Sequence, residues 1–139
     1  MDGFFFEDLA LGQSASFAKT ITEADILLFS AVSGDTNPVH INAEAAAASM
    51  FKERIAHGML SASLISTVLG TRLPGPGTIY LSQNLKFKAP VRIGETVTAT
   101  ATITALDSAR KRATLSTICT VAGRTVIDGE ATVMVSSRP

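Results

Sequence analysis

Apolar and polar residues follow two different periods along the chain, and the change falls near Gly77. Before that point apolar residues recur with helical spacing, and after it they recur at every second position. This pattern predicts an α+β protein whose helices are followed by an antiparallel sheet. No repeat, linker or low-complexity tract divides the sequence, so we expect residues 1–139 to form one domain.

Three helices are expected in the first half. The segment Thr22–Asp25 has the form of a capping box and is followed by apolar residues with helical spacing, which predicts a helix that ends near Gly34. Asn42 is a suitable N-cap for a short helix through the alanines of residues 45–48. The segment Gly58–Gly70 has no charged residue on any helical face, so it predicts a helix that is buried on nearly every side.

The second half predicts four strands that form an antiparallel meander. They are Thr78–Lys88, Thr96–Leu106, Ala113–Val121 and Arg124–Val135. The second strand alternates threonines with small apolar residues, which leaves room for the apolar helix to lie across it. We therefore expect a sheet that curls around the helix Gly58–Gly70. Since the sheet covers one side of that helix only, a second copy of the chain is expected to cover the rest in a homodimer.

Charge and hydropathy exclude several partners. The formal net charge is +0 and the pI is about 6.7, so there is no long-range attraction for nucleic acid or for anionic lipid. The mean hydropathy is +0.30, but the longest strongly hydrophobic stretch, Gly58–Thr71, is shorter than the roughly 20 residues that span a bilayer. The first residues contain neither a basic segment nor a long apolar run, which predicts a cytoplasmic protein.

The single cysteine and the two histidines limit covalent and metal chemistry. One cysteine forms no internal disulfide, and this set offers little for a structural zinc site. Cys119 lies in an alternating segment, so we interpret it as a small buried strand residue rather than a nucleophile.

Two positions are candidates for chemistry. Asp35 and His40 lie in a loop restricted by Pro38, where a carboxylate and an imidazole could hold and polarise one water without a metal. The alternative is that Asp35 closes a turn and His40 is a surface residue. Gly58 begins the apolar helix, whose first N–H groups are unpaired, so it could form an oxyanion site or could be only a close packing position. The preceding His57 is expected to have a structural role.

The segment Phe29–His40 resembles the signature of the MaoC-like (R)-specific enoyl-CoA hydratases, and the likeness extends over nearly the whole chain through His57–Met59, Tyr80–Val91 and Gly129–Ala131. Within that family it resembles the bacterial enzymes that link fatty-acid β-oxidation to polyhydroxyalkanoate synthesis. The resemblance implies a hot-dog fold, a homodimer, an acyl-CoA substrate and no cofactor beyond the substrate's own CoA. It also implies reversible hydration of a trans-2-enoyl-CoA to an (R)-3-hydroxyacyl-CoA.

The resemblance assigns roles to particular residues. Asp35 and His40 become the catalytic pair that binds the reacting water, and the Gly58 N–H becomes the donor to the thioester oxygen. We expect Asp35 to take the water proton and His40 to return one, while Asn37 holds the loop.

The acyl chain is expected to lie along one stripe of the apolar helix. That stripe contains Ala62, Ser66 and Leu69, and Ser66 is also a candidate hydrogen-bond partner of Asp35 or His40.

Basic residues near the mouth of the pocket are expected to meet the CoA phosphates, and the sequence leaves open which of them do so. The candidates are Lys52, Arg54, Lys86, Lys88, Arg92 and Arg110–Arg112. Chain-length preference and the choice between CoA and a carrier protein stay open as well. Two alternative functions remain: a hot-dog acyl-CoA thioesterase, which would direct water at the thioester carbon, and a non-catalytic acyl-CoA or acyl-carrier binding module.

Overall fold

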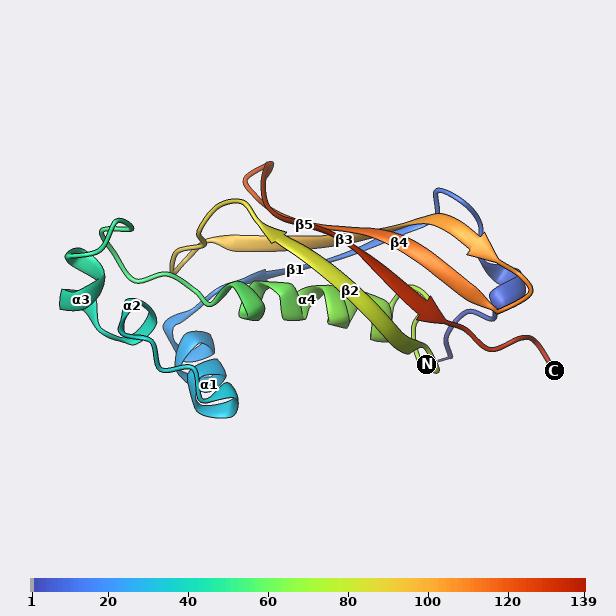
Figure 1. The fold of residues 1–139 in the computed structure, drawn as a ribbon, viewed down its shortest axis with the longest axis horizontal. Helices are drawn as coiled ribbons and strands as arrows, with labels where there is room; N and C mark the ends of the chain where they lie inside the picture. Colours follow the sequence, from blue (N-terminus) through green and yellow to red (C-terminus); the bar gives the residue numbers. More distant parts are fainter. Residues whose placement is uncertain (1) are drawn as a thin grey trace.

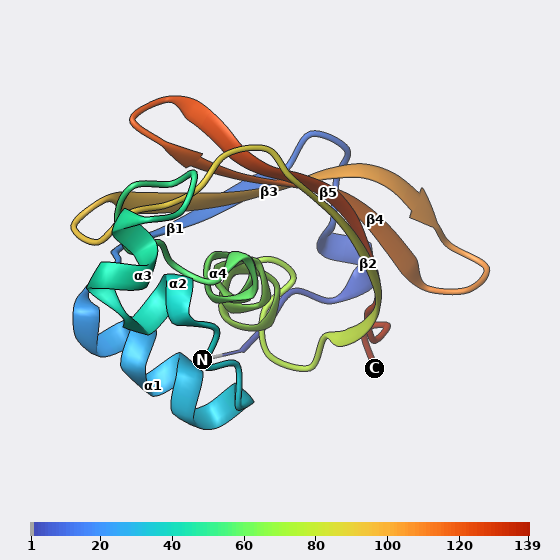
Figure 2. The ribbon, with the colours of Figure 1, turned by 60° about the vertical axis from the view of Figure 1, so that its left-hand side comes forward.

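A curved antiparallel sheet wraps around one long helix in this computed structural model, which describes residues 2–139 (Figure 1, Figure 2). The strands are β1 (Ser14–Thr20), β2 (Ile79–Phe87), β3 (Thr96–Asp107), β4 (Arg112–Val121) and β5 (Arg124–Met134). The helices are the 3-10 turn η1 (Phe6–Asp8), α1 (Glu23–Ser33), α2 (Pro38–Ile41), α3 (Ala43–Ala47) and α4 (Gly58–Thr71). The predicted arrangement of a sheet around the apolar helix is confirmed.

The helix ends follow the capping signals of the sequence. The Thr22 hydroxyl accepts the Asp25 N–H at 3.2 Å, the Asp25 carboxylate accepts the Thr22 N–H at 2.9 Å, and Gly34 ends α1 in the left-handed conformation at φ 79°. The Asn42 side chain accepts the Ala45 N–H at 2.9 Å and begins α3. The single turn of α2 was not predicted, because four residues are too few to show helical periodicity.

The predicted meander is only partly correct. The strand order is β1-β3-β4-β5-β2, so β3, β4 and β5 form the meander while β2 crosses over and pairs with β5. The edge beside β3 is occupied by β1, which was not predicted because Phe17 is its only large apolar residue. The crossover places the end of β2 and the residues after it beside the start of α4 (Figure 1).

The helix α4 packs chiefly on β3, and also on β1 and β4. The β3 residues that face it are small or branched and fully buried: Val97, Ala99, Ala101 and Ile103. Ala105 was expected on the same face but is exposed, because the register between β3 and β4 shifts between Ile103 and Ala105.

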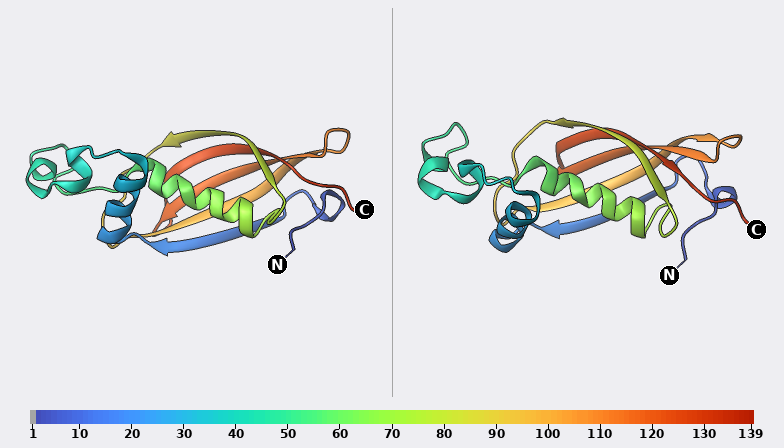
Figure 3. Two further views of the ribbon diagram at one scale, coloured as in Figure 1. Left: turned by 90° about the horizontal axis from the view of Figure 1, so that it is seen from below. Right: turned by 60° about the horizontal axis from the view of Figure 1, so that its bottom comes forward.

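One side of α4 stays open in the single chain. Leu64, Ile65 and Val68 are buried, whereas Ser63 and Ser66 are exposed, so the prediction of a helix buried on nearly every side is wrong for the chain alone. Seen from below, no other element of residues 2–139 crosses α4 on the side away from the sheet (Figure 3). On this open side α4 exposes Met59 together with Ser63 and Ser66.

Two further expectations concern the core and the membrane. Cys119 is fully buried on β4, and burial raises the pKa of its thiol to about 11, which confirms it as a core residue. Among the helices of residues 2–139, none has both the length and the apolar character that a bilayer crossing requires.

Candidate active site

A cavity of about 560 Å³ lies at the N-terminal end of α4. Its wall is formed by the loop after α1, by the segment that leads into α4, and by the end of β2 with the residues that follow it. Asp35, His40 and Gly58 all line this cavity, although they come from three separate parts of the chain. The fold thus brings together the acid–base pair and the helix start that the sequence singled out.

Asp35 is placed by hydrogen bonds within its own loop. Its N–H donates to the Ser33 hydroxyl at 3.1 Å, and its carboxylate accepts the Asn37 N–H at 3.2 Å. The Asn37 side chain in turn accepts the Val39 N–H at 3.2 Å and caps α2. Asn37 is not part of the cavity wall, and its contacts are those of a residue that shapes the loop.

His40 is held through both its ring and its main chain, and only 8% of its surface is exposed. Its Nδ1 lies 2.8 Å from the carbonyl oxygen of Ile55, which only accepts, so Nδ1 carries the proton and Nε2 of the neutral ring is a free acceptor. The Arg54 guanidinium donates to the His40 carbonyl at 2.8 Å and to Glu23 at 2.7 Å. Arg54 therefore links the first turn of α1 to the end of α2.

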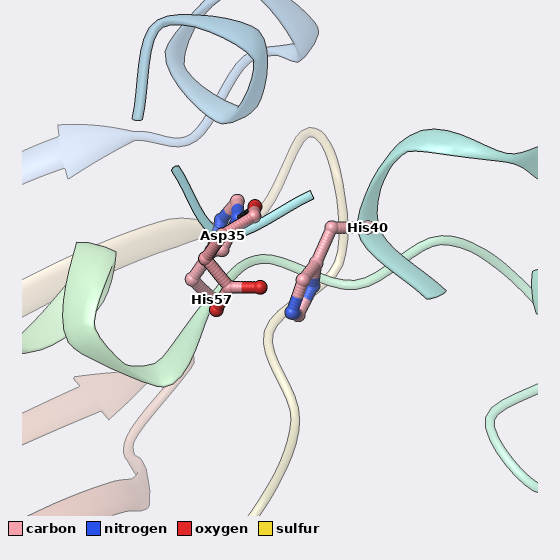
Figure 4. A group of neighbouring side chains, drawn as sticks. All are labelled: Asp35, His40 and His57. Carbon is pink, nitrogen blue, oxygen red and sulfur yellow. Dashed lines mark hydrogen bonds between the residues drawn. The ribbon is translucent and has the colours of Figure 1, made fainter. Parts of the chain in front are cut away.

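Asp35, His40 and His57 form a close group: each offers one oxygen or nitrogen atom that could ligate a metal, and these three atoms lie within 4.8 Å of one another (Figure 4). The Asp35 carboxylate faces the His40 ring in this view, and no hydrogen bond joins the two side chains directly within the described chain. Two acceptors that face one cavity without touching can share a water, which donates one hydrogen to each. This geometry suits the polarisation of a single water.

A cation is the other occupant that two imidazoles and a carboxylate could accept. The Nε2 atom of His57 already lies 3.0 Å from the Asp35 carbonyl oxygen and 3.1 Å from the Ser30 hydroxyl. A metal bound through that nitrogen would displace both contacts. The two contacts therefore disfavour a cation at Nε2 of His57, and Asp35 and His40 are two groups that can hold a water between them.

Gly58 is the first residue of α4, and its N–H has no acceptor among residues 2–139. This N–H lies at the positive end of a 14-residue helix, where a developing negative charge is stabilised. A Cβ at this position would lie 2.6 and 2.7 Å from two ring atoms of Phe87. Glycine thus lets the Phe87 ring pack directly against the first residue of α4.

Ser66 and Leu69 lie outside the wall of this cavity, and their expected contact with the acyl chain stays a prediction. They follow Gly58 by about 12 and 16 Å along the helix axis at 1.5 Å per residue. Leu69 is 1% exposed and packs in the core, whereas Ser66 is exposed on the open side of α4. No hydrogen bond joins Ser66 to Asp35 or His40 in the part of the chain that the structure describes. The stripe is about 100° wide, and it crosses from the covered face of α4 to the open one.

The basic candidates separate clearly by position. Lys88 lines the cavity. Arg54 and Arg92 are engaged with Glu23 and Glu53 respectively. The group Arg110–Arg112 lies at the turn between β3 and β4, at the other end of the sheet from α2 and α3 (Figure 1).

Three residues near the cavity have roles that the sequence pattern did not reveal. Arg54 was one of the candidates for the CoA phosphates and Phe87 one apolar residue of an expected strand, and the contacts that distinguish them connect positions distant in sequence. His57 was expected to be structural, but its contacts with Asp35 and His40 were not foreseen.

A curved antiparallel sheet around a central helix, with the site at the start of that helix, defines the hot-dog class of fold. The model of the family described as "MaoC like domain" matches residues 8–128 of this chain, and the chain therefore belongs to that family. The hot-dog fold and the family that the sequence predicted are both confirmed.

Relatives of known name cover almost the whole chain. An (R)-specific enoyl-CoA hydratase of Rhodospirillum rubrum is 65% identical over 134 residues, which are 96% of this chain and 93% of the relative. A mitochondrial 3-hydroxyacyl-(acyl-carrier-protein) dehydratase of Solanum lycopersicum is 38% identical over 93% of this chain and 79% of its own length.

Solved structures agree with the fold. The unliganded R-hydratase of Pseudomonas aeruginosa superposes with a TM-score of 0.93 at 44% identity, and covers 98% of this chain and 88% of its own. The (R)-hydratase of Aeromonas caviae involved in PHA biosynthesis superposes with a TM-score of 0.90 at 43% identity, and covers 93% and 98% respectively.

Proposed function

We propose that this protein is an (R)-specific enoyl-CoA hydratase, which reversibly adds water to a trans-2-enoyl-CoA to form an (R)-3-hydroxyacyl-CoA. The observation that carries the proposal is the placement of a carboxylate, an imidazole and an unpaired helix-start N–H around one cavity. The names of the relatives from Rhodospirillum rubrum and Aeromonas caviae support the same reaction here.

The proposed reaction begins with a water held by Asp35 and His40. The carboxylate and the free Nε2 of His40 each accept one of its hydrogen bonds, which leaves an oxygen lone pair free to attack C3 of the substrate. As the oxygen–C3 bond forms, the water proton passes to the pair, with Asp35 as the base. That proton then passes from Asp35 to the unprotonated Nε2 of His40, which delivers it to C2, so that H and OH of one water are added and both side chains return to their starting states.

Negative charge moves to the thioester oxygen when the double bond is attacked. Gly58 lines the cavity and its N–H has no acceptor among the described residues, which supports it as the donor of the hydrogen bond that this oxygen needs. One preorganised donor of this kind contributes about 3 kcal/mol to transition-state stabilisation. The reactants are only water and the thioester, and we propose that no cofactor takes part.

Two alternative functions predict different products. A thioesterase would direct water at the thioester carbon and release free CoA, and a binding module would consume nothing. Crotonyl-CoA separates the three when enoyl absorbance and free thiol are followed together. Hydration removes the absorbance without releasing thiol, whereas thiol release would support the thioesterase, and binding without turnover would support the module.

We also propose that the protein works as a two-fold dimer. The edge strand β2 exposes Ile79, Leu81 and Phe87, and α4 exposes Met59 on its open side. These apolar groups and the small residues Ser63 and Ser66 form a surface that a second copy would cover, and Ser66 would then lie in the interface. Sedimentation should give twice the 14.5 kDa chain mass, and Ser63→Glu should lower it. A monomeric wild type at micromolar concentration would contradict the dimer.

The (R)-hydratase of Aeromonas caviae is involved in PHA biosynthesis, and this supports a place for the present protein between fatty-acid oxidation and polyhydroxyalkanoate synthesis. The single cysteine is compatible with the reducing cytoplasm that we propose as its location. The relative from Solanum lycopersicum is named for a carrier-protein substrate, so crotonyl-CoA and the same acyl group on a carrier protein should be compared. We expect the higher kcat/KM with the CoA ester.

A further inference from the structure

His57 touches every part of the proposed machinery, although it was expected only to begin the helix. It is 2% exposed, and its Nε2 lies 3.0 Å from the Asp35 carbonyl oxygen. A carbonyl oxygen only accepts hydrogen bonds, so Nε2 carries the hydrogen and its N–H donates a hydrogen bond to the main-chain carbonyl of Asp35. The Ser30 hydroxyl lies 3.1 Å from the same nitrogen and shares this N–H.

The ring of His57 is held between two other rings. It stacks on His40 with centroids 3.9 Å apart and planes inclined by 27°, and Phe29 lies 4.8 Å away at 54°. Its Nδ1 is buried and has no hydrogen-bond partner in the described chain. The tautomer with a bare Nδ1 therefore avoids burying an unpaired N–H.

The next residue along the chain is Gly58, and His57 is the N-cap of α4. One side chain thus contacts the main chain of Asp35 and the ring of His40, while its own backbone leads into the Gly58 N–H. Local hydrogen bonds set the main chain between Asp35 and His40, and the His57 contacts connect this segment to the start of α4.

We propose that His57 is a positioning residue, whose Nε2–H and ring fix Asp35, His40 and the Gly58 N–H relative to one another. The proposal rests on the proposed hydratase function. It predicts that loss of the donor lowers kcat with little change in KM, because the wall that binds the thioester stays in place. A misplacement of about 1 Å in such a site costs on the order of a hundredfold in rate.

Three substitutions separate the donor from the ring. His57→Gln places an amide N–H near the position of Nε2 without the ring, and His57→Phe keeps an aromatic ring without the donor. His57→Asn is the matched control, since its shorter amide reaches only the position of Nδ1. Val133→Ala serves as a stability control, because Val133 is buried on β5 away from the cavity wall.

The test measures kcat and KM for crotonyl-CoA hydration together with thermal unfolding. We expect kcat to fall at least about thirtyfold in His57→Phe and His57→Asn, with KM within threefold of wild type. His57→Gln should recover at least about tenfold of that loss. Val133→Ala should unfold at a lower temperature but keep its kcat.

The outcomes distinguish the inference from the function on which it rests. An active wild type with a His57→Phe kcat within threefold of it would overturn the positioning role. The positioning role would also be overturned if His57→Asn had the same kcat as His57→Gln. This comparison decides the question if His57→Phe does not fold. A wild type that hydrates no enoyl-CoA would overturn the proposed function itself, and the inference with it.

Discussion

Gly58→Ala tests the oxyanion position without removing its N–H. The added methyl would lie 2.6 and 2.7 Å from atoms of the Phe87 ring, closer than carbon atoms approach without displacement. Phe87 is 54% exposed in the single chain but belongs to the surface proposed to be covered in the dimer, so the fold and the assembly of this variant are checked together with its activity. The methyl and the displaced ring would both narrow the cavity beside the start of α4, where the thioester oxygen is proposed to bind.

The expected loss follows from that obstruction. If the hydrogen bond to the thioester oxygen is lost, its contribution of about 3 kcal/mol corresponds to a decrease in kcat/KM of roughly a hundredfold. The double variant Gly58→Ala/Phe87→Ala removes the collision within the protein but leaves the methyl at the start of α4. We expect its kcat/KM to stay low, whereas Phe87→Ala alone should lose less than about tenfold.

The assay is the hydration of crotonyl-CoA, followed by enoyl absorbance, with circular dichroism to confirm that each variant is folded. A Gly58→Ala enzyme with wild-type kcat/KM would refute the role of this N–H. Full recovery in the double variant would show instead that Phe87 alone causes the loss.

Three substitutions and one labelling experiment test other parts of the structure. Asp35→Asn and His40→Ala should each lower kcat at least about a hundredfold in the same assay without unfolding the protein, because a well-placed acid or base contributes at least that much. A variant with the wild-type rate would remove its residue from the mechanism. Arg54→Met should lower kcat about tenfold and the free energy of unfolding in urea by about 1–3 kcal/mol, because it removes the charged donor to the His40 carbonyl; an unchanged kcat would show that His40 does not need this link. Cys119 should resist alkylation by iodoacetamide at pH 8 until urea unfolds the protein, because burial raises the pKa of its thiol to about 11 and keeps it protonated below that pH; rapid labelling of the native protein would contradict its burial.

Much of the fold follows from local signals in the sequence. The capping box at Thr22, the glycine at position 34 and the uncharged helix from Gly58 are each set by a few adjacent residues, and the structure contains all three features. Crossover of β2 is different, because pairing partners far apart in sequence leave no mark on local periodicity. The weakly alternating β1 was missed for a related reason, since its place beside β3 is decided by the rest of the sheet.

The candidate site shows the same division. Asp35, His40 and Gly58 are recognisable from their residue types and positions in a loop or at a helix start, and the fold brings them to one cavity. Ser66 and Leu69 do not line that cavity, because helical periodicity gives a direction around the axis but not the distance from the site, and their contact with the acyl chain stays a prediction.

The sequence pattern could not predict contacts between segments that are distant along the chain. Arg54 meets the carbonyl of His40, and the His57 ring stacks on that of His40, and neither contact has a local signature.

The central claim is that Asp35 and His40 direct water to C3 of an enoyl thioester while Gly58 binds its carbonyl oxygen. The most direct measurement incubates the purified protein with crotonyl-CoA, follows enoyl absorbance and free thiol together, and determines the configuration of the product. The expected result is loss of absorbance, no free thiol, and (R)-3-hydroxybutyryl-CoA as the only enantiomer. Thiol release, or an (S)-configured product, would contradict it.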